Sequence, residues 1–415
     1  MSGPRKLFEF LKAASVAHAQ WDYEVSMSIL KNRKKLLILL AMLAPILAIS
    51  FVEASDMIGG KTAYAPAFYS NLIFFVSIAV GLAAGLITGC IGAGGGFIIT
   101  PALMAAGVKG ILAVGTDLFH IFAKAIMGTT VHKKLGNVSV KLAIAFLVGS
   151  AGGTFIGGAI QKGLYDKDPL LSEAFISLVY AVLLGFLGFY ALIDFLKSRK
   201  EADAGGHGAH GGPSSIPPLG MKVQNMKIPP MISFDEDLGG RKVSGIIVAM
   251  GGVIVGILAA IMGVGGGFIT FPMFVYVFGV SSMTTVGTDI LQIIFTAGIG
   301  AVTQYAIYGY VFYTLAMGML IGSLIGIQVG ALTTKVVKGI HIRGFYAMSI
   351  IAGFINRVAT LPKKLTELEV IHMSKSVSSG IETAGNIIFW IVVGFFGFWV
   401  ISKFFTNIKT LREEA

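Results

Sequence analysis

Cysteine and charge are both scarce in this chain of 415 residues. Only one cysteine, Cys90, is present, which excludes an intramolecular disulfide and any multi-cysteine metal cluster. Charged residues make up 13% of the chain, roughly half the share of a soluble domain. Hydrophobic residues make up 55%, and the mean hydropathy is +0.82. This composition excludes an ordinary soluble domain and predicts a membrane protein.

Several motifs that would indicate other functions are also missing. No Gly-Lys-Ser/Thr follows the Gly-rich segments, so they do not form a nucleotide-binding loop. No barrel-type alternation of apolar and polar residues occurs. No nucleophile with a nearby base and no metal-ligand cluster emerges. The sequence therefore predicts no enzyme, no cofactor and no metal. We interpret the net charge of +11 as Lys and Arg in cytoplasmic loops rather than as a nucleic-acid surface.

Long apolar runs predict an all-α polytopic membrane protein. Several reach roughly 18 residues, enough to cross a bilayer. The first, Leu36–Val52, follows the basic cluster Lys31–Lys35, so we expect an uncleaved anchor with the N-terminus in the cytoplasm. The expected segments are a cytoplasmic N-terminal segment with an extra transmembrane helix (1–69), a first transporter repeat (70–196), a flexible cytoplasmic linker (197–242), a second repeat (243–360), and a C-terminal segment with an extra transmembrane helix (361–415).

The two repeats are visible as an internal duplication. The block Gly92–Pro101 reappears as Gly263–Pro272 and is identical at seven of ten positions. Each copy is followed by Gly-Thr-Asp, at Gly115–Asp117 and Gly287–Asp289. A third block, with Gly149, Ser150, Gly153 and Gly157, matches Gly322, Ser323, Gly326 and Gly330, and the offset drifts only from 171 to 173 residues. Such a small drift indicates two copies of one structural unit.

The loop charges predict that the second repeat is inverted in the membrane. The loop after Val131 carries Lys133, Lys134 and Lys141, whereas its counterpart at 304–309 is uncharged. The next pair of loops reverses this bias, as expected when equivalent loops face opposite sides. This topology requires broken or re-entrant helices at the Gly blocks. It places Arg357–Lys375 on the outer side of the membrane, although this segment holds four basic residues.

The doubled Gly block is the predicted site. Consecutive glycines destabilise a helix, and irregular backbone at membrane depth survives only where it is buried in protein or lines a cavity. We expect each break to start a helix whose amides face an anion. Thr100 is the predicted N-cap of the first helix, followed by Pro101 in its first turn, and Thr270 lies near Pro272 in a similar way. The alternative is that small residues only allow close packing, which we favour for the Gly149 and Gly322 series.

Polar residues inside an apolar run complete the prediction. Asp117, His120 and Lys124 are spaced three and four residues apart, so they share one helix face. Such residues face a protein interior or an aqueous path, because charge in lipid is costly. They could attract an anion and relay a proton, or form a buried pair that only stabilises the first half. The equivalent residues Asp289, Gln292 and Thr296 include no cation, so the predicted site is asymmetric.

These motifs give the chain a resemblance to the sulfite exporter TauE/SafE family over residues 70–355. The resemblance rests on both Gly-Gly-Gly-Phe blocks, the prolines that follow them and the two Gly-Thr-Asp segments, where the family commonly has Gly-Thr-Ser. It implies an inner-membrane exporter of sulfite or a small organosulfonate.

The sequence thus predicts a secondary exporter of a small inorganic or organosulfur anion, embedded in the lipid bilayer and without nucleic acid. The predicted substrate-binding residues are Gly94, Gly95, Gly96, Phe97, Thr116, His120, Lys124, Gly265, Gly266, Gly267, Phe268, Thr288 and Gln292. Asp117 and Asp289 are the predicted proton-coupling residues. Two other functions stay open: an anion channel, and a cation-coupled transporter in which these aspartates bind the ion.

Overall fold

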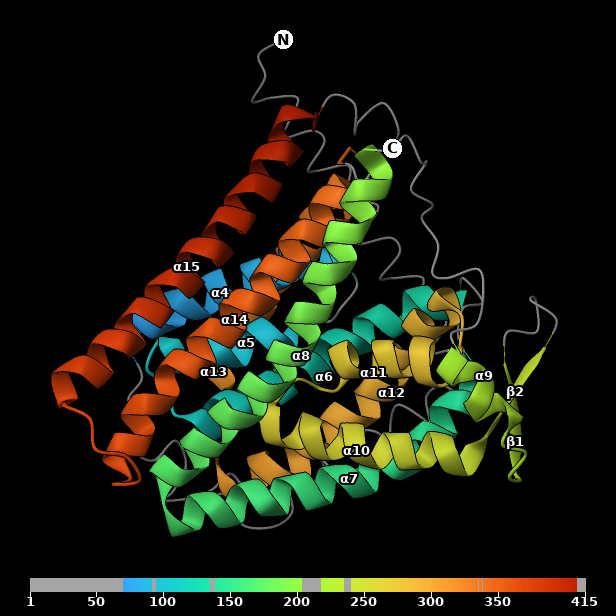
Figure 1. Cartoon of the computed structure of the whole chain (residues 1–415), viewed down its shortest axis with the longest axis horizontal. Helices are drawn as coiled ribbons and strands as arrows, with labels where there is room; N and C mark the ends of the chain where they lie inside the picture. Colours follow the sequence, from blue (N-terminus) through green and yellow to red (C-terminus); the bar gives the residue numbers. More distant parts are fainter. Residues whose placement is uncertain are drawn as a thin grey trace, which may run out of the picture. The chain divides into compact units, whose positions relative to one another are not determined.

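The computed structural model describes residues 70–91, 95–134, 139–203, 218–234, 240–334, 336–337 and 339–408, which all lie in one compact unit. The predicted anchor Leu36–Val52 and Gly94 fall outside these residues. The first repeat contains α4 (Asn71–Ile91), α5 (Gly96–Ala105), α6 (Gly110–Lys134), α7 (Val140–Lys167) and α8 (Pro169–Asp203) (Figure 1). The second contains α10 (Gly245–Met262), α11 (Gly267–Pro272) with a π-helical turn (Met273–Val277), α12 (Ser282–Gly300) with irregular turns to Tyr308, α13 (Tyr313–Thr333) and α14 (Gly339–Glu367).

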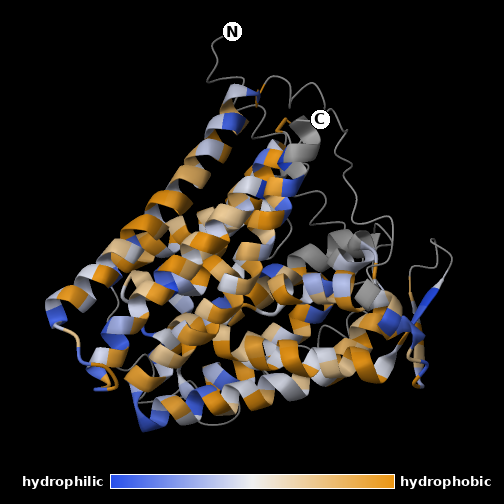
Figure 2. Ribbon diagram, in the orientation of Figure 1, coloured by the Kyte–Doolittle hydropathy of each residue, from blue (hydrophilic) through white to orange (hydrophobic). Residues whose placement is uncertain are grey.

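The described residues confirm an all-α polytopic membrane protein. Eight of their helices are long and apolar enough to cross a membrane, and the last is α15 (Lys375–Thr406). The helix α6 has 25 residues and is not among these eight. Figure 2 shows apolar residues along most of α15, with hydrophilic residues at the turn between α14 and α15. The eight spans carry large apolar side chains on their outer faces, such as Phe186 and Phe398, both 71% exposed, as lipid contact requires.

Helices of one repeat pack against helices of the other in a reciprocal way. The first long helix of each repeat lies beside the fourth helix of the other, so α4 contacts α13 and α10 contacts α7. Both pairs run parallel. Gly81 lies against Met319 and Gly330 against Leu86 in the first pair, and Gly149 lies against Ala249 and Gly157 against Ile257 in the second. A Cβ atom at Gly153 would lie 2.2 Å from the Val253 carbonyl oxygen, and one at Gly326 would lie 2.4 Å from that of Leu82. This confirms that the third glycine series serves close helix packing.

Equivalent helices of the two repeats run antiparallel where they meet. On α6 and α12, Leu118 faces Gly300 and Phe122 faces Gly298. On α8 and α14, Leu184 faces Gly353 and Phe195 faces Gly344. In each pair, the contact positions rise in number along one helix while they fall along the other, so the two helices run in opposite directions. Two copies of one unit whose matching helices oppose each other are inverted repeats, as the loop charges predicted.

Two segments differ from the sequence-based expectation. The predicted topology places Arg357 at the start of a segment on the outer side of the membrane, but α14 continues as a helix to Glu367 and Arg357 is 1% exposed. The connection to α15 is therefore short, and α15 begins at Lys375. Its described turns pack on α14, where the rings of Phe345 and Trp399 lie 4.5 Å apart.

Part of the predicted linker has regular structure. It holds α9 (Pro218–Asn225) and an antiparallel hairpin of β1 (Met231–Phe234) and β2 (Arg241–Ser244), in which Met231 pairs with Ser244. Gln224 Nε2 donates to the carbonyl of Phe278 at 2.8 Å. These contacts attach the end of the linker to the second repeat.

Candidate functional site

Two short buried helices, α5 and α11, begin at the doubled Gly block. Their N-caps are Gly95, with φ of 69°, and Gly266, with φ of 95°, and both values lie in the left-handed region that favours glycine. Residues Gly96–Leu103 of α5 and Gly267–Thr270 of α11 are buried. Both helices therefore start inside the protein, as the broken-helix prediction requires.

The helix starts lie five residues earlier than predicted for the first block. Thr100 and Thr270 are not N-caps but lie inside α5 and α11, and their prolines are also helical. The left-handed glycines turn the chain directly into the helix, so no side-chain cap is needed. The amides at the first turns thus belong to Gly96–Phe97 and Gly267–Phe268, which have no carbonyl partner within their own helix. This shift agrees with the amides that the sequence singled out.

The two Gly blocks approach each other across the pseudo-two-fold. The rings of Phe97 and Phe268, equivalent residues of α5 and α11, have centroids 5.8 Å apart. A Cβ at Gly96 or at Gly265 would lie within 3 Å of the Ile121 side chain on α6. A Cβ at Gly267 would lie 3.2 Å from the Asp289 carboxylate. The structure therefore brings the described glycines of both blocks around α6 and α12.

The first repeat contributes a buried polar chain to this region. Thr100 Oγ1 donates to Asp117 Oδ2 at 2.9 Å, and His120 Nε2 lies 3.0 Å from Ser323 Oγ on α13. Asp117 Oδ1 and His120 Nδ1 are 3.7 Å apart, and neither has a hydrogen-bond partner among the described residues. Lys124 follows one turn further along the same face and is 9% exposed. This chain carries a carboxylate, an imidazole and an ammonium group away from solvent.

The second repeat holds the equivalent chain without a cation. Gln292 Nε2 donates to Asp289 Oδ1 at 2.8 Å and lies 3.4 Å from Thr270 Oγ1. Gln292 Oε1 accepts from Thr296 Oγ1 at 2.8 Å, and that hydroxyl lies 2.8 Å from Ser150 Oγ on α7. Ser150 and Ser323 are equivalent, so each repeat's serine completes the polar chain of the other. The predicted asymmetry of charge between the two halves is present in the structure.

The two Gly-Thr-Asp threonines have partners that the sequence did not predict. Thr116 Oγ1 accepts from the backbone N–H of Phe312 at 2.9 Å, and Thr288 Oγ1 accepts from that of Ser139 at 3.0 Å. Phe312 and Ser139 are the N-cap residues of α13 and α7. Each threonine therefore satisfies an amide at a helix start of one of the reciprocal pairs, and its proton is left to donate elsewhere.

Sequence reasoning missed Arg357 on α14. Its Nη2 lies 3.3 Å from the Pro101 carbonyl and its Nη1 lies 3.2 Å from Met104 Sδ, so it reaches the C-terminal half of α5. Arg357, Thr360 and Lys364 are spaced three and four residues apart, the signal that was used for Asp117, His120 and Lys124. Because the predicted topology places Arg357 at the start of a segment on the outer side of the membrane, this spacing did not indicate a buried helix face.

Inverted repeats with broken helices and buried polar residues at their interface are a common architecture of membrane transporters. The family model described as Sulfite exporter TauE/SafE matches residues 77–356, more than half of the chain. The chain belongs to this family, whose members are membrane transporters.

Curated relatives agree with that assignment. The chain is 25% identical over 273 residues to the probable membrane transporter protein YunE of Bacillus subtilis. This alignment covers 62% of this chain and 87% of the relative. The chain is 23% identical over 287 residues to the probable membrane transporter protein MJ0441 of Methanocaldococcus jannaschii, with coverage of 66% and 90%. No solved structure matches the chain. The region matched by the family model ends at residue 356, before Arg357 and α15.

Proposed function

We propose that this protein is a secondary transporter that exports a small sulfur-containing anion such as sulfite, sulfate or an organosulfonate. In this proposal it lies in the inner membrane with its N-terminus in the cytoplasm. The observation that carries the proposal is the meeting of the two half-helix starts, at Phe97 and Phe268, beside a face of α6 that holds buried His120 and Lys124.

Anion binding follows from the charges at that place. The N-terminal amides of α5 and α11 carry the positive end of their helix dipoles. Lys124 adds a full positive charge where desolvation strengthens electrostatic attraction. The proposed ligands are the amides of Gly95–Phe97 and Gly265–Phe268, with His120, Lys124 and Gln292. Gly94 belongs to the same set by sequence, and Thr116 and Thr288 contribute by holding the neighbouring helix starts and through their remaining protons.

Proton coupling is the second part of the proposal. Asp117 Oδ1 is buried, lacks a hydrogen-bond partner among the described residues and lies 3.7 Å from His120 Nδ1. A buried carboxylate oxygen without a hydrogen bond is costly unless it is protonated or binds a ligand. Asp117 therefore carries the transported proton, with Asp289 as its equivalent in the second repeat. The same atom favours the alternative in which the two aspartates bind a cation.

Ligand-induced thermal stabilisation tests the proposal. The purified full-length protein is melted in detergent with sulfite, sulfate, thiosulfate, sulfoacetate or chloride, all as sodium salts at equal ionic strength. We expect one sulfur oxyanion to raise the melting temperature, and Lys124→Ala to fold but lose that increase. A rise with every sodium salt, and none when choline replaces sodium, would support cation binding instead. Saturable flux in proteoliposomes that responds to a pH gradient separates the transporter from a channel.

A further inference from the structure

Two buried tyrosines hold the C-terminal end of α10, where the second Gly block begins. The Tyr180 hydroxyl, on α8, donates to the Met262 carbonyl at 2.6 Å, and the Tyr305 hydroxyl, in the turns after α12, donates to the Ala260 carbonyl. Both tyrosines are 1% exposed or less. The last carbonyls of a helix have no partner within it, so these bonds fix the point at which α10 ends.

The segment that follows Met262 touches the start of α5 as well. Gly263 has φ of 80°, and a Cβ there would lie 2.9 Å from Thr100 Oγ1. A Cβ at Gly96 would lie 3.1 Å from Val264 Cα. A shift of the Met262 carbonyl is therefore passed both to the second Gly block and to the first turn of α5.

Tyr180 differs from Tyr305 because it also belongs to the polar chain of Asp117. The Thr100 hydroxyl, which donates to Asp117 Oδ2 at 2.9 Å, lies within hydrogen-bonding reach of the Tyr180 oxygen. Asp117 also acts electrostatically on Tyr180, whereas no described charged group acts on Tyr305 in this way. Three side chains thus form a row from the proposed proton carrier of the first repeat to the end of α10.

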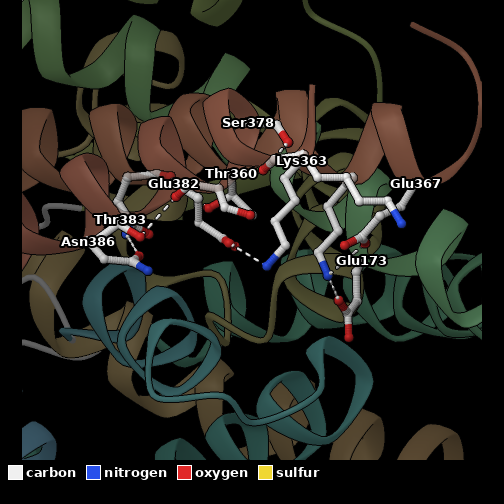
Figure 3. A network of polar contacts seen from close by, with 12 residues as sticks. Glu173, Thr360, Lys363, Glu367, Ser378, Glu382, Thr383 and Asn386 are labelled. Atoms are coloured by element: carbon white, nitrogen blue, oxygen red, sulfur yellow. Dashed lines mark hydrogen bonds and ion pairs between the residues drawn. The ribbon is translucent and has the colours of Figure 1, made fainter. Parts of the chain in front are cut away.

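Charged groups hold α8 in place around Tyr180. Glu173 lies two turns before Tyr180 on the same face of α8 and pairs with Lys364 of α14 at 2.7 Å. Figure 3 shows Glu173 beside the polar network that joins α14 to α15. Arg357 of α14 acts electrostatically on Tyr180. These contacts limit the rotation of α8 and keep the Tyr180 hydroxyl in position.

The number of hydroxyl protons determines what each group in the row can donate. Thr100 has one proton and gives it to Asp117 Oδ2, so the Tyr180 oxygen receives none from Thr100. A proton taken up from water by Asp117 is best placed on Oδ2, because Oδ1 has no hydrogen-bond partner among the described residues. Oδ2 then donates to the Thr100 oxygen, and the Thr100 hydroxyl turns to donate to Tyr180. The only covalent change is the new O–H bond of Asp117.

We propose that Tyr180 is a positioning residue that conveys the protonation of Asp117 to the second Gly block. The inference rests on the proton coupling proposed above. A hydroxyl that accepts one hydrogen bond donates a stronger one. A proton on Asp117 therefore tightens the bond from Tyr180 to Met262 and fixes the end of α10 more firmly, and release of the proton loosens it. In this way the first repeat controls the backbone break of the second.

Infrared titration of the purified full-length protein tests the row without any anion. A protonated carboxyl has a C=O band that is lost on ionisation, and the band missing in Asp117→Asn belongs to Asp117. In Tyr180→Phe the protonated form loses the acceptor of the Thr100 hydroxyl. We therefore expect the proton affinity of Asp117 to fall by about two- to tenfold, the effect of one neutral hydrogen bond. Tyr305→Phe breaks the neighbouring bond to Ala260 and is the matched control, with no change expected.

The other titratable or charged groups that face the row stay the same in every variant. His120 and Lys124 on α6 face Asp117, and Arg357 on α14 faces Tyr180. A difference between Tyr180→Phe and Tyr305→Phe is therefore not caused by these groups.

Hydrogen exchange tests the far end of the row. After correction for the intrinsic effect of pH, we expect exchange at the amides of residues 263–267 to slow by about twofold or more when Asp117 is protonated. Tyr180→Phe and Thr100→Val remove this dependence, since each interrupts the row. Thr100→Ser keeps the hydroxyl and retains the dependence. If Tyr180→Phe does not fold, the two Thr100 variants decide, and equal exchange in both overturns the inference.

A double-mutant cycle completes the test. Adding Tyr180→Phe to Thr100→Val should change the proton affinity of Asp117 no further, because the row is already interrupted. Effects that add in the double variant, or equal effects of Tyr180→Phe and Tyr305→Phe, overturn the inference. A band of Asp117 that titrates but does not respond to Tyr180→Phe overturns the inference alone. The absence of any titrating band of Asp117 overturns the proposed proton coupling and the inference with it.

Discussion

The two repeats share one scaffold but differ in the chemistry of their buried polar chains. In the first, Asp117, His120 and Lys124 form a face with three titratable groups. In the second, Asp289, Gln292 and Thr296 form the same face with one. The hydrogen bonds differ accordingly: the second chain is continuous from Asp289 to Ser150, whereas the first leaves Asp117 Oδ1 and His120 Nδ1 without hydrogen-bond partners among the described residues.

This difference indicates that the two repeats, although alike in structure, have different roles. A chain of polar side chains that are bonded to one another and include no cation stabilises its repeat and has few groups left for a ligand. A chain with open acceptors and a cation is less favourable in the free protein but is prepared for a proton or an anion. We infer that the second repeat holds the shape of the site and that the first supplies most of its charge.

Removing the lysine that distinguishes the first repeat tests this comparison most directly. Lys124→Thr gives the first repeat the residue of the second, and we expect anion affinity to fall by about 10- to 100-fold, since a charge-assisted bond is lost. Thr296→Ala, which removes a neutral hydroxyl, is the control and changes affinity much less. Binding measured by calorimetry that falls equally in both variants would show that charge is not what distinguishes the repeats.

Substitutions in the shared scaffold have nearly equal effects in the two repeats. Gly153→Ala and Gly326→Ala each place a Cβ against a carbonyl of the partner helix, and we expect each to lower the free energy of unfolding by about 1–3 kcal/mol. Gly152→Ala on α7 meets no atom within 4 Å and serves as the control. Thermal melts in detergent measure all three. A loss at only one of the two equivalent glycines would mean that the reciprocal helix pairs are not equivalent.

The two aspartates differ in a smaller but measurable way. Asp117→Asn removes the open acceptor Oδ1, whereas Asp289→Asn alters a carboxylate that already has Gln292 as a donor. We expect Asp117→Asn to reduce the response of transport to an imposed pH gradient more strongly. Flux in proteoliposomes, with and without the gradient, gives the result. Equal responses in both variants would assign proton movement to neither aspartate in particular.

The serines that connect the repeats give the smallest effects. Ser323→Ala removes the bond to His120 Nε2, so that neither ring nitrogen has a hydrogen-bond partner among the described residues, whereas Ser150→Ala leaves Thr296 bonded to Gln292. A lost neutral hydrogen bond costs about 0.5–1.5 kcal/mol and an unsatisfied buried group about 1–3 kcal/mol. Ser323→Ala should therefore reduce the stability of the protein more than Ser150→Ala. Chemical unfolding measures the free energy of unfolding of both variants. Equal losses in the two variants would contradict this prediction.

Much of the fold could be predicted from local patterns. The duplication, the inverted arrangement and the broken helices follow from the repeated Gly block and from loop charges, which depend only on sequence. The start of α5 could not be placed correctly, because the left-handed conformation of Gly95 replaces the side-chain cap that Thr100 would have provided. The partners of Thr116 and Arg357 lie 196 and 256 residues away, and local spacing carries no information about such distant contacts.

The reciprocal packing of α4 with α13 has a consequence for how the chain is assembled. The bond from Cys90 Sγ to the carbonyl of Gly330 joins residues 240 positions apart in a parallel helix pair. During synthesis α4 enters the membrane long before α13 is made. The small-residue face of α4 therefore contacts lipid until α13 packs against it. Contacts of such long sequence separation form late and slowly. The first repeat therefore cannot complete its packing as an independent folding unit, and expression of either half alone should yield an unstable fragment that co-expression of the other half rescues.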